Sequence, residues 1–362
     1  MKALVVGGTG PSGPHIVNGL IDRGYEVTVL HGGQHEAHFV RPVEHVHVDP
    51  HFAETLAPAL QERSFDLAIV TYGRTRIVAE LLKGKTRRLI AVSGSAAYAA
   101  PDDPRWGALG RPSMISEDSP LADHPEPSRF AHLIWLTEET IMRAQREGYY
   151  QATIFRYPEQ YGPNALANAD WSVVRRILDG RKHIIIPANA VMRKRGYPEN
   201  TTHALLLAVD KPDASSGQIY NIRDEHQYSR RQHIEFIARR LNHDWEIVEL
   251  PASLAGKVRK SDSEIEYDIT KVRIQLGYRD VVAPEEALAR SVDWLLKNRP
   301  QPGGEAEQQL GDAFAYDAED ELIREFRQGI ARAAAVKFPT VRSGHMYRHP
   351  KKPGEPWKPL DA

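Results

Sequence analysis

The chain has 362 residues, which is enough for one large domain or two fused ones, and its 41% hydrophobic and 26% charged content is ordinary for a globular protein. Its 47 basic and 48 acidic side chains give no field that would attract nucleic acid or an anionic membrane. No apolar run approaches the roughly 20 residues of a membrane span, and the first residues do not resemble a secretory signal. The absence of cysteine excludes disulfides, thiol nucleophiles and thiolate metal sites. We therefore expect a cytoplasmic protein that binds neither nucleic acid nor membrane.

The first thirty residues predict a strand, a glycine-rich turn, a helix and a second strand. The apolar run at 3–6 suits a buried parallel strand, and residues 7–13 follow it with the spacing Gly-x-x-Gly-x-x-Gly. Pro14 suits the first turn of a helix, because its missing amide would be unpaired there anyway. Residues 26–30 then return as a strand. In this context glycines let the backbone approach a diphosphate, and the amides at the helix N-terminus favour its charge.

Further segments follow in an order that resembles the extended short-chain dehydrogenase/reductase superfamily, and within it the NAD-dependent epimerase/dehydratase family. The segments that carry the resemblance, beside the glycine turn, are 47–49, 67–74, 89–98, 155–163, 220–222 and 271–278. The resemblance covers about residues 1–299. It implies an α/β fold with a doubly wound, Rossmann-like parallel sheet and a smaller α+β substrate lobe.

The same resemblance implies a cofactor, NAD or NADP. The positions that match cofactor contacts of the family are Gly7, Thr9, Gly10, Pro11, Ser12, Gly13, His31, Asp49, Tyr72, Gly73, Arg74 and Ser93. The choice between the two cofactors stays open, because the second strand is followed by residues 31–34, which offer neither an acid for the ribose nor an arginine for a 2′-phosphate. His31, Gln34 or His35 could contact such a phosphate.

The catalytic pair of the family is missing. In relatives a tyrosine transfers the substrate proton, and a lysine four residues later lowers its pKa, because an unperturbed phenol has a pKa near 10. Here no tyrosine occurs between Tyr98 and Tyr149, and no lysine between Lys85 and Lys182.

The alignment register of the helix expected at 129–139 does not change this result. The catalytic positions hold Phe130 and Ile134 in one register and Ala131 and Trp135 in the other. Neither pair supplies a phenol or an amine. The sequence therefore predicts a relocated acid/base group or a protein without the usual chemistry.

Three residues are candidates for the missing roles. His132 lies on the same helix and could act as acid or base without a pKa shift, or could be a packed or solvent-facing histidine. Tyr98, at the exit of the fifth strand, is the nearest phenol, or an ordinary pocket wall. Ser95 is near the position of the serine that orients the substrate in the family. Residues 267–271 have the Tyr-x-x-x-Lys spacing but lie far downstream, where the resemblance implies a structural lysine.

Substrate contacts are expected where the sixth strand enters the second lobe. The resemblance places Tyr157, Gln160 and Tyr161 along the substrate cleft. Arg195 ends a basic triplet at a position where relatives often contact an anionic substrate, although the triplet could equally be a solvated turn. Arg74 could bind a phosphate or carboxylate in bidentate fashion, or pair with a surface acid.

Sixteen histidines invite a metal-binding interpretation. Those that crowd together in the sequence are His31, His35, His38, His45, His47 and His51. They span a strand end, a loop and another strand, with no acid–histidine pair at helical spacing. Convergence on one ion is not implied, and no metal site is predicted.

We expect three segments: a Rossmann region at 1–163, which includes the degenerate catalytic helix, a substrate lobe at 164–299, whose strands or helices could return to the first region, and an extension at 300–362. The lobe pattern predicts helices at 173–178, 202–209, 231–241 and 283–296 and strands at 184–186 and 245–250. Residues 300–304 resemble a linker, and 319–335 an amphipathic helix. The extension could cap the substrate cleft, clasp a second subunit or stay disordered.

Three functions remain open at this point. The first is an enzyme of the extended short-chain dehydrogenase type with a relocated acid/base, acting on a small-molecule carbonyl or alcohol by redox, epimerase, isomerase or lyase chemistry. The second is a cofactor-binding regulator or scaffold, and the third a non-redox enzyme with a structural nucleotide. A homodimer is possible in each case.

Overall fold

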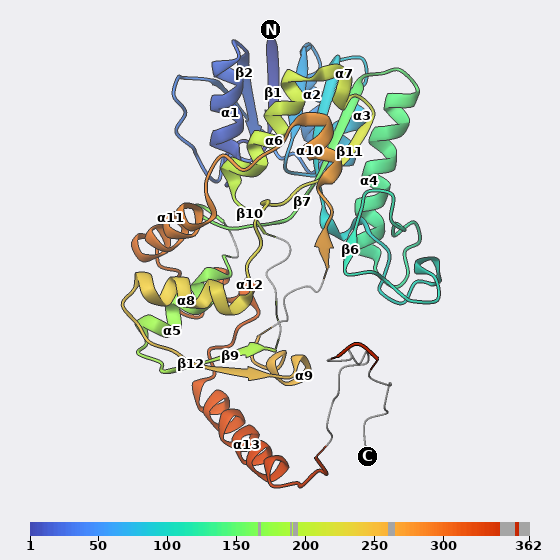
Figure 1. Cartoon of the computed structure of the whole chain (residues 1–362). Coiled ribbons are helices and arrows are strands. Elements are labelled where there is room, and N and C mark those ends of the chain that lie inside the picture. The colour runs from blue at the N-terminus through green and yellow to red at the C-terminus, as the bar shows by residue number, and fades with distance from the viewer. Residues whose placement is uncertain (166–167, 189, 191–194, 260–264, 341–351, 355–362) are drawn as a thin grey trace. The chain divides into compact units, whose positions relative to one another are not determined.

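The computed structural model describes residues 1–165, 168–188, 190, 195–259, 265–340 and 352–354 (Figure 1). The chain forms two units, Met1–Phe314 and Ala315–Ala362. No helix among the described residues is long and apolar enough to cross a membrane.

The first unit is built on a seven-stranded parallel sheet with the order β11-β7-β5-β4-β1-β2-β3. Its strands are β1 (Lys2–Val6), β2 (Glu26–His31), β3 (Glu44–His47), β4 (Leu67–Val70), β5 (Arg88–Gly94), β7 (Gln151–Tyr157) and β11 (Gln218–Asn221). Apolar runs such as that of β4 are buried along their whole length, as expected for a parallel sheet covered on both faces. The predicted α/β fold with a doubly wound sheet is confirmed.

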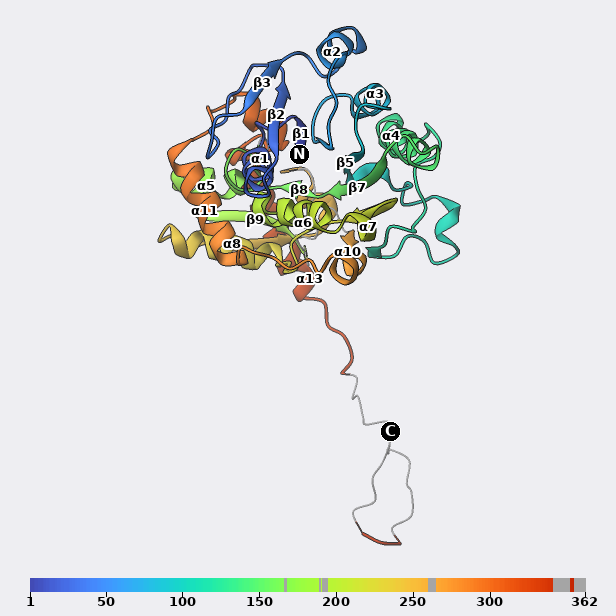
Figure 2. The ribbon, with the colours of Figure 1, turned by 90° about the horizontal axis from the view of Figure 1, so that it is seen from above.

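Helices cover the two faces of the sheet (Figure 2). One face packs on α1 (Gly13–Asp22), α6 (Pro198–Asp210) and α10 (Thr270–Leu276). The other packs on α2 (Ala53–Leu60), α3 (Thr75–Leu81) and α4 (Arg129–Arg146). Since α6, α10 and β11 come from beyond residue 163, the second half of the chain returns to complete the Rossmann region.

The second lobe has its own core around a parallel pair of strands, β9 (His183–Pro187) and β12 (Glu246–Leu250). Its helices include α5 (Asp170–Leu178), α8 (Arg230–Arg240) and α11 (Pro284–Lys297). Short elements complete the unit: β6 (Met114–Ile115) with β13 (Glu266–Tyr267), β8 (Glu159–Gln160) with β10 (Arg195–Gly196), α7 (Pro212–Ser215), α9 (Ala252–Ala255), α12 (Glu305–Leu310), and the 3-10 turns η1 (Ser95–Ala97) and η2 (Pro104–Trp106).

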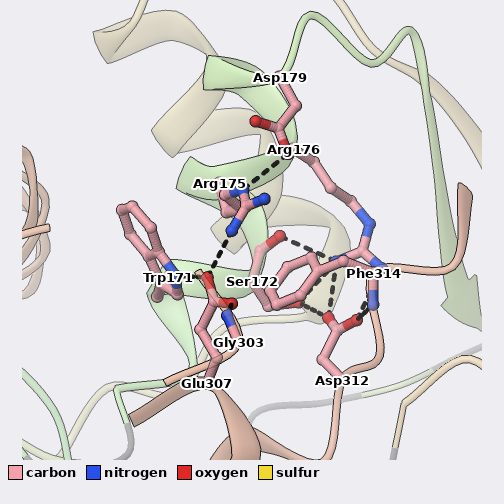
Figure 3. A network of polar contacts seen from close by, with 9 residues as sticks. All are labelled: Trp171, Ser172, Arg175, Arg176, Asp179, Gly303, Glu307, Asp312 and Phe314. Atoms are coloured by element: carbon pink, nitrogen blue, oxygen red, sulfur yellow. Dashed lines mark hydrogen bonds and ion pairs between the residues drawn. The ribbon is translucent and has the colours of Figure 1, made fainter. Parts of the chain in front are cut away.

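Residues 300–314 belong to this lobe, although the sequence assigned them to the extension. Glu307 accepts hydrogen bonds from the indole of Trp171 at 2.8 Å and from Arg175 at 2.7 Å (Figure 3). Asp312 forms a buried ion pair with Arg176 at 2.6 Å. These polar contacts fix the segment on α5, so the division we placed at residue 300 moves to 314.

The second unit contains α13 (Tyr316–Ala334), which matches the helix predicted at 319–335. The two aromatic residues of the tail, Tyr347 and Trp357, lie outside the described residues.

Candidate functional site

The turn between β1 and α1 is built for glycine. Gly7 and Gly8 have φ angles of 110° and 61°, which side chains rarely adopt. A Cβ on Gly7 would lie 2.3 Å from the Thr71 hydroxyl, and one on Gly13 would lie 2.2 Å from the Gly8 carbonyl. Because these glycines carry no side chain, the start of α1 can lie against the ends of β1 and β4. The backbone is therefore brought close to the carboxyl edge of the sheet, where open α/β sheets bind ligands.

Three amides of this turn, those of Gly8, Gly10 and Ser12, have no acceptor among the described residues, and the last two lie at the start of α1. The Thr9 and Gly13 amides donate to Gly7 and Gly10 within the turn at 2.7 and 3.0 Å. The amides of Gly10 and Ser12 donate to no other residue in the described part of the chain. Around Gly10 no heavy atom lies within 4 Å of a Cβ position. Open space, two amides and a helix N-terminus fit a diphosphate.

The two prolines of the segment limit the number of donors. Pro11 and Pro14 have no N–H, so neither can donate to a phosphate. Binding would rest on the remaining amides and on the Thr9 and Ser12 hydroxyls, both half-buried.

The next two strand ends place the other predicted cofactor residues on the same edge. Asp49 accepts hydrogen bonds from the amide and ring of His51 at 2.9 and 2.6 Å, and these bonds lower the pKa of its carboxyl. Tyr72 is exposed and meets the His51 ring edge-on. Arg74 is exposed and lies over the Phe52 ring at 5.1 Å, without an acidic partner among the described residues. Gly73 has a φ of 85°, and a Cβ there would meet Pro50 at 2.7 Å.

Three histidines of β2 and β3 converge, although the sequence did not imply it. His31, His45 and His47 lie together with Glu36, their ligand-type atoms all within 4.8 Å of one another. His31 is buried, and this burial lowers its pKa despite the nearby Glu36. The other three crowded histidines are not part of this group.

The helix that should carry the dyad is α4. Phe130 is exposed, Ala131 is buried, and Ile134 and Trp135 are half-buried. Nδ1 of His132 lies 3.1 Å from the Ala122 carbonyl, which can only accept, so Nδ1 carries the hydrogen and Nε2 of the neutral ring is an acceptor.

His132 is placed close to the exit of β5. It is half-buried and stacks on Trp135, and its partner Ala122 donates through its amide to the Ala97 carbonyl at 2.8 Å. His132 is thus connected through Ala122 to Ala97, the residue before Tyr98.

Tyr98 is buried and hydrogen-bonded. Its hydroxyl donates to the Asn221 side chain at 2.6 Å, and its ring lies under Arg156 and stacks on Tyr267. Burial raises the pKa of Tyr98 to about 12, although Arg156 acts in the opposite direction. The geometry favours a neutral phenol at neutral pH.

Ser93 is joined to a buried ion pair. Its hydroxyl donates to Glu138, which also accepts from Arg156 at 2.7 Å. Arg156 and Glu138 come from β7 and α4, so this pair fixes the helix on the sheet. The side chain of Ser95 lies outside the described residues.

The two residues of the downstream Tyr-x-x-x-Lys pair contact different partners. Tyr267 is buried against Tyr98, whereas the Lys271 ammonium donates to the Ile219 carbonyl at 2.9 Å and lies over the Tyr220 ring. Lys271 thus ties α10 to β11.

The structure brings together Gln160, Tyr161 and Arg195. β8 pairs with β10, and the Arg195 guanidinium lies 4.0 Å from the centre of the Tyr161 ring. Arg195 is buried and donates to Asp170 at 2.7 Å. Tyr157 is also buried and donates to the Thr201 carbonyl at 3.3 Å.

Several buried polar atoms of this group are unsatisfied. Nε and one terminal nitrogen of Arg195 and the Gln160 side-chain oxygen have no hydrogen-bond partner among the described residues. Buried polar groups are normally paired, so such atoms point to a bound molecule or water.

Sequence reasoning missed the buried acids around these sites. Asp170, fully buried, accepts from Arg195, His233 and Ser291, and although burial opposes it, these partners hold the pKa of Asp170 below its usual range. Glu117 accepts from the Asn221 amide at 2.7 Å, and burial raises its pKa. Only long-range contacts reveal these acids, because neither lies in a segment with a recognisable pattern.

Fold and turn together define a Rossmann-type α/β protein with a glycine-rich turn after its first strand. The comparisons with known proteins narrow this class. Residues 68–222 match the NAD dependent epimerase/dehydratase family. This match confirms the resemblance seen in the sequence.

Curated relatives are distant. The uncharacterised protein y4nL of Sinorhizobium fredii is 26% identical over 261 residues, 64% of this chain and 69% of that protein. The UDP-N-acetyl-alpha-D-glucosaminuronate decarboxylase of Bacillus cytotoxicus is 24% identical over 327 residues, 81% of this chain and 97% of that protein.

Solved structures share the fold. A UDP-glucose 4-epimerase of Thermotoga maritima with UDP-glucose superposes with a TM-score of 0.66 at 20% identity, covering 83% of this chain and all (100%) of that one. A UDP-glucuronic acid 4-epimerase of Bacillus cereus in complex with NAD has a TM-score of 0.62 at 17% identity, with coverage of 83% and 100%.

Proposed function

We propose that the protein is an NAD(H)-dependent enzyme of the epimerase/dehydratase type that acts on a hydroxyl or carbonyl group of a small molecule. The observation that carries this proposal is the turn at residues 7–13, with open space at Gly10 and two free amides at a helix N-terminus. The family match and the NAD-bound fold neighbour support it.

NAD(H) is preferred to NADP(H) on electrostatic grounds. Glu36 is exposed in the loop after β2, and its carboxylate lies 3.2–3.9 Å from the nearest ring nitrogens of three histidines. When no metal ion is bound nearby, a carboxylate at the end of the second strand can accept from a ribose hydroxyl and repels a 2′-phosphate. His31, which could have met such a phosphate, therefore has a negative charge beside it.

The substrate is proposed to be anionic. Arg195 has two unsatisfied nitrogens, next to the unsatisfied oxygen of Gln160 and the ring of Tyr161. A guanidinium matches phosphate or carboxylate oxygens, although Asp170 already balances part of its charge. Sugar nucleotides are the first class to test, because the names of the decarboxylase relative and of the 4-epimerase with the same fold refer to them.

His132 is the proposed acid/base. When bound, NAD supplies an acceptor for a hydride removed from the substrate carbon. The substrate hydroxyl then needs a base for its proton, and Nε2 of His132 is an acceptor on the helix where the family keeps its tyrosine. Tyr98 would position the site rather than ionise, because its hydroxyl is bonded to Asn221 and its pKa is raised. The predicted Ser95 stays a candidate for substrate orientation.

Two measurements test this proposal. Calorimetric titration of the purified full chain should show NAD(H) binding, and the absence of binding at millimolar NADH would contradict it. Sugar nucleotides and simple alcohols are then assayed by nicotinamide absorbance and product chromatography.

The role of His132 is tested with His132→Asn. Asparagine can keep a donor for the Ala122 carbonyl at the Nδ1 position but has no titratable nitrogen. We expect kcat to fall by about 100-fold or more. Tyr98→Phe is the comparison variant, and it should retain most of kcat. The reverse ranking would move the role to the phenol.

A regulator without chemistry is the second candidate, because Phe130 and Ile134 occupy the dyad positions in one register. Nicotinamide binding with no turnover on the full panel, and no effect of His132→Asn on any property, would favour it. The homodimer also stays a prediction, which light scattering tests.

A further inference from the structure

His31, at the end of β2, and His45 and His47, on β3, share one face of the sheet for a simple geometric reason. His45 and His47 are two residues apart on β3, and successive side chains of a strand alternate between faces. The parallel register pairs His31 with His47 across the two strands. Since β3 is the edge strand of the seven-stranded sheet, three imidazoles gather at its border.

Glu36 reaches this group from the loop between the two strands. Its carboxylate oxygens lie 3.2 Å from His47 Nε2, 3.4 Å from His45 Nδ1 and 3.9 Å from His31 Nε2. His31 Nε2 and His45 Nδ1 are 3.0 Å apart. In a tetrahedral site with bonds of about 2.0–2.1 Å, neighbouring ligand atoms are about 3.3–3.4 Å apart. These four separations, which involve both carboxylate oxygens, bracket that value, and one ligand atom from each residue can be chosen so that all pairs lie within 4.8 Å.

The loop is anchored on both sides of Glu36. Gly33 turns it with a φ of 74°, and the Val40 amide donates to the Asn18 side chain on α1 at 3.0 Å. Phe39 packs against the core of this face of the sheet and lies beside the His45 ring. A ligand set supported in this way needs little rearrangement to close on an ion.

We propose that His31, Glu36, His45 and His47 bind one divalent transition-metal ion, with Zn²⁺ as the expected occupant. Three imidazoles and one carboxylate are a ligand set that zinc accepts, and imidazole also suits nickel and cobalt. Hard ions such as Mg²⁺ or Ca²⁺ prefer oxygen ligands, and this group offers mainly nitrogen.

The same four residues could instead form only a hydrogen-bonded ion pair. The Gly33 amide donates to His31 Nδ1 at 3.3 Å, so in the free protein Nε2 carries the hydrogen and donates to His45. Binding through Nε2 needs the other tautomer of the neutral ring, with the hydrogen on Nδ1, and therefore releases the Gly33 amide.

The experiment uses the full chain without a histidine tag, stripped of metal with chelator. Co²⁺ titration followed by visible absorption reports four-coordinate geometry, and Zn²⁺ calorimetry reports affinity and stoichiometry. We expect one ion per chain and the intense absorption of tetrahedral cobalt. Glu36→Gln and His47→Ala should each weaken Zn²⁺ binding by more than the roughly 10–100-fold that loss of an outer-sphere partner costs.

His35→Ala and His38→Ala are the matched controls, because both histidines are exposed in the same loop but lie outside the group. They should bind as the wild type does. Glu36→Gln changes an exposed side chain, so it keeps the test valid if His47→Ala fails to fold. A wild-type chain without tetrahedral cobalt absorption, or equal affinities in Glu36→Gln and His35→Ala, would overturn the proposal. Neither result depends on nucleotide binding.

Discussion

Replacement of Gly10 by alanine separates the folding role of the glycine turn from its binding role. No heavy atom lies within 4 Å of the added Cβ, and Gly10 is not among the residues with positive φ. The unfolding free energy should therefore stay within about 0.5 kcal/mol of the wild type. The added methyl group would occupy the space proposed for the diphosphate. We expect NADH affinity to fall at least tenfold, which corresponds to about 1.4 kcal/mol or more.

The same substitution at Gly13 should have the opposite profile. Its Cβ would lie 2.2 Å from backbone atoms of Gly8, which cannot rotate away as a side chain could. Forced packing of this kind typically costs about 1–3 kcal/mol of stability. Gly329→Ala, also in open space but on α13, is the control for both measurements.

Calorimetric NADH titration and urea denaturation of the three variants provide the data. A Gly10→Ala protein that bound NADH as tightly as the wild type would refute the reasoning, because the diphosphate would then lie elsewhere. Equal stability losses at Gly10 and Gly13 would also contradict it.

Three further predictions concern charge. Burial lowers the pKa of His233, beside Asp170, to about 4, so between about pH 4 and 6.5 the unfolded state binds more protons than the folded state. The free energy of unfolding should therefore fall as the pH drops through this window. The variant His233→Gln, which can keep a donor for Asp170, should flatten this pH dependence in urea denaturation. Asp312→Asn breaks the buried ion pair with Arg176 and should lower the free energy of unfolding by about 3 kcal/mol. An unchanged denaturation midpoint would show that residues 300–314 do not stabilise the lobe. Glu36→Gln, assayed with chelator present, should raise the affinity for NADPH relative to NADH by about tenfold, or about 1.4 kcal/mol; an unchanged ratio in competition titrations would remove Glu36 from cofactor choice.

The sheet could be predicted because its signals are local. Residues 67–70 form β4 as expected, since a short apolar run between turn signals suits a strand buried on both faces. Two-residue strands such as β8 and β10 have no periodicity and were not predictable. The docking of 300–314 was missed because proline and glycine at 300–304 indicate a linker, whereas Glu307 and Asp312 find their partners on a distant helix.

In the candidate site, too, the local features were predictable and the long-range ones were not. The glycine turn is a local pattern, and its geometry follows from the sequence alone. The histidine group depends on the register between β2 and β3, which cannot be read from spacing across a long loop. The bond between Tyr98 and Asn221 joins residues 123 positions apart, so only the folded chain shows that this phenol is engaged.

The attachment of residues 300–314 to α5 sets a limit for shortened versions of this protein. A truncation at residue 299, where the sequence suggests a natural stop, would remove the carboxylates that meet Trp171, Arg175 and Arg176. It would also uncover the side of the lobe on which Leu310 and Phe314 pack. A fragment intended for crystallisation should therefore end no earlier than Phe314.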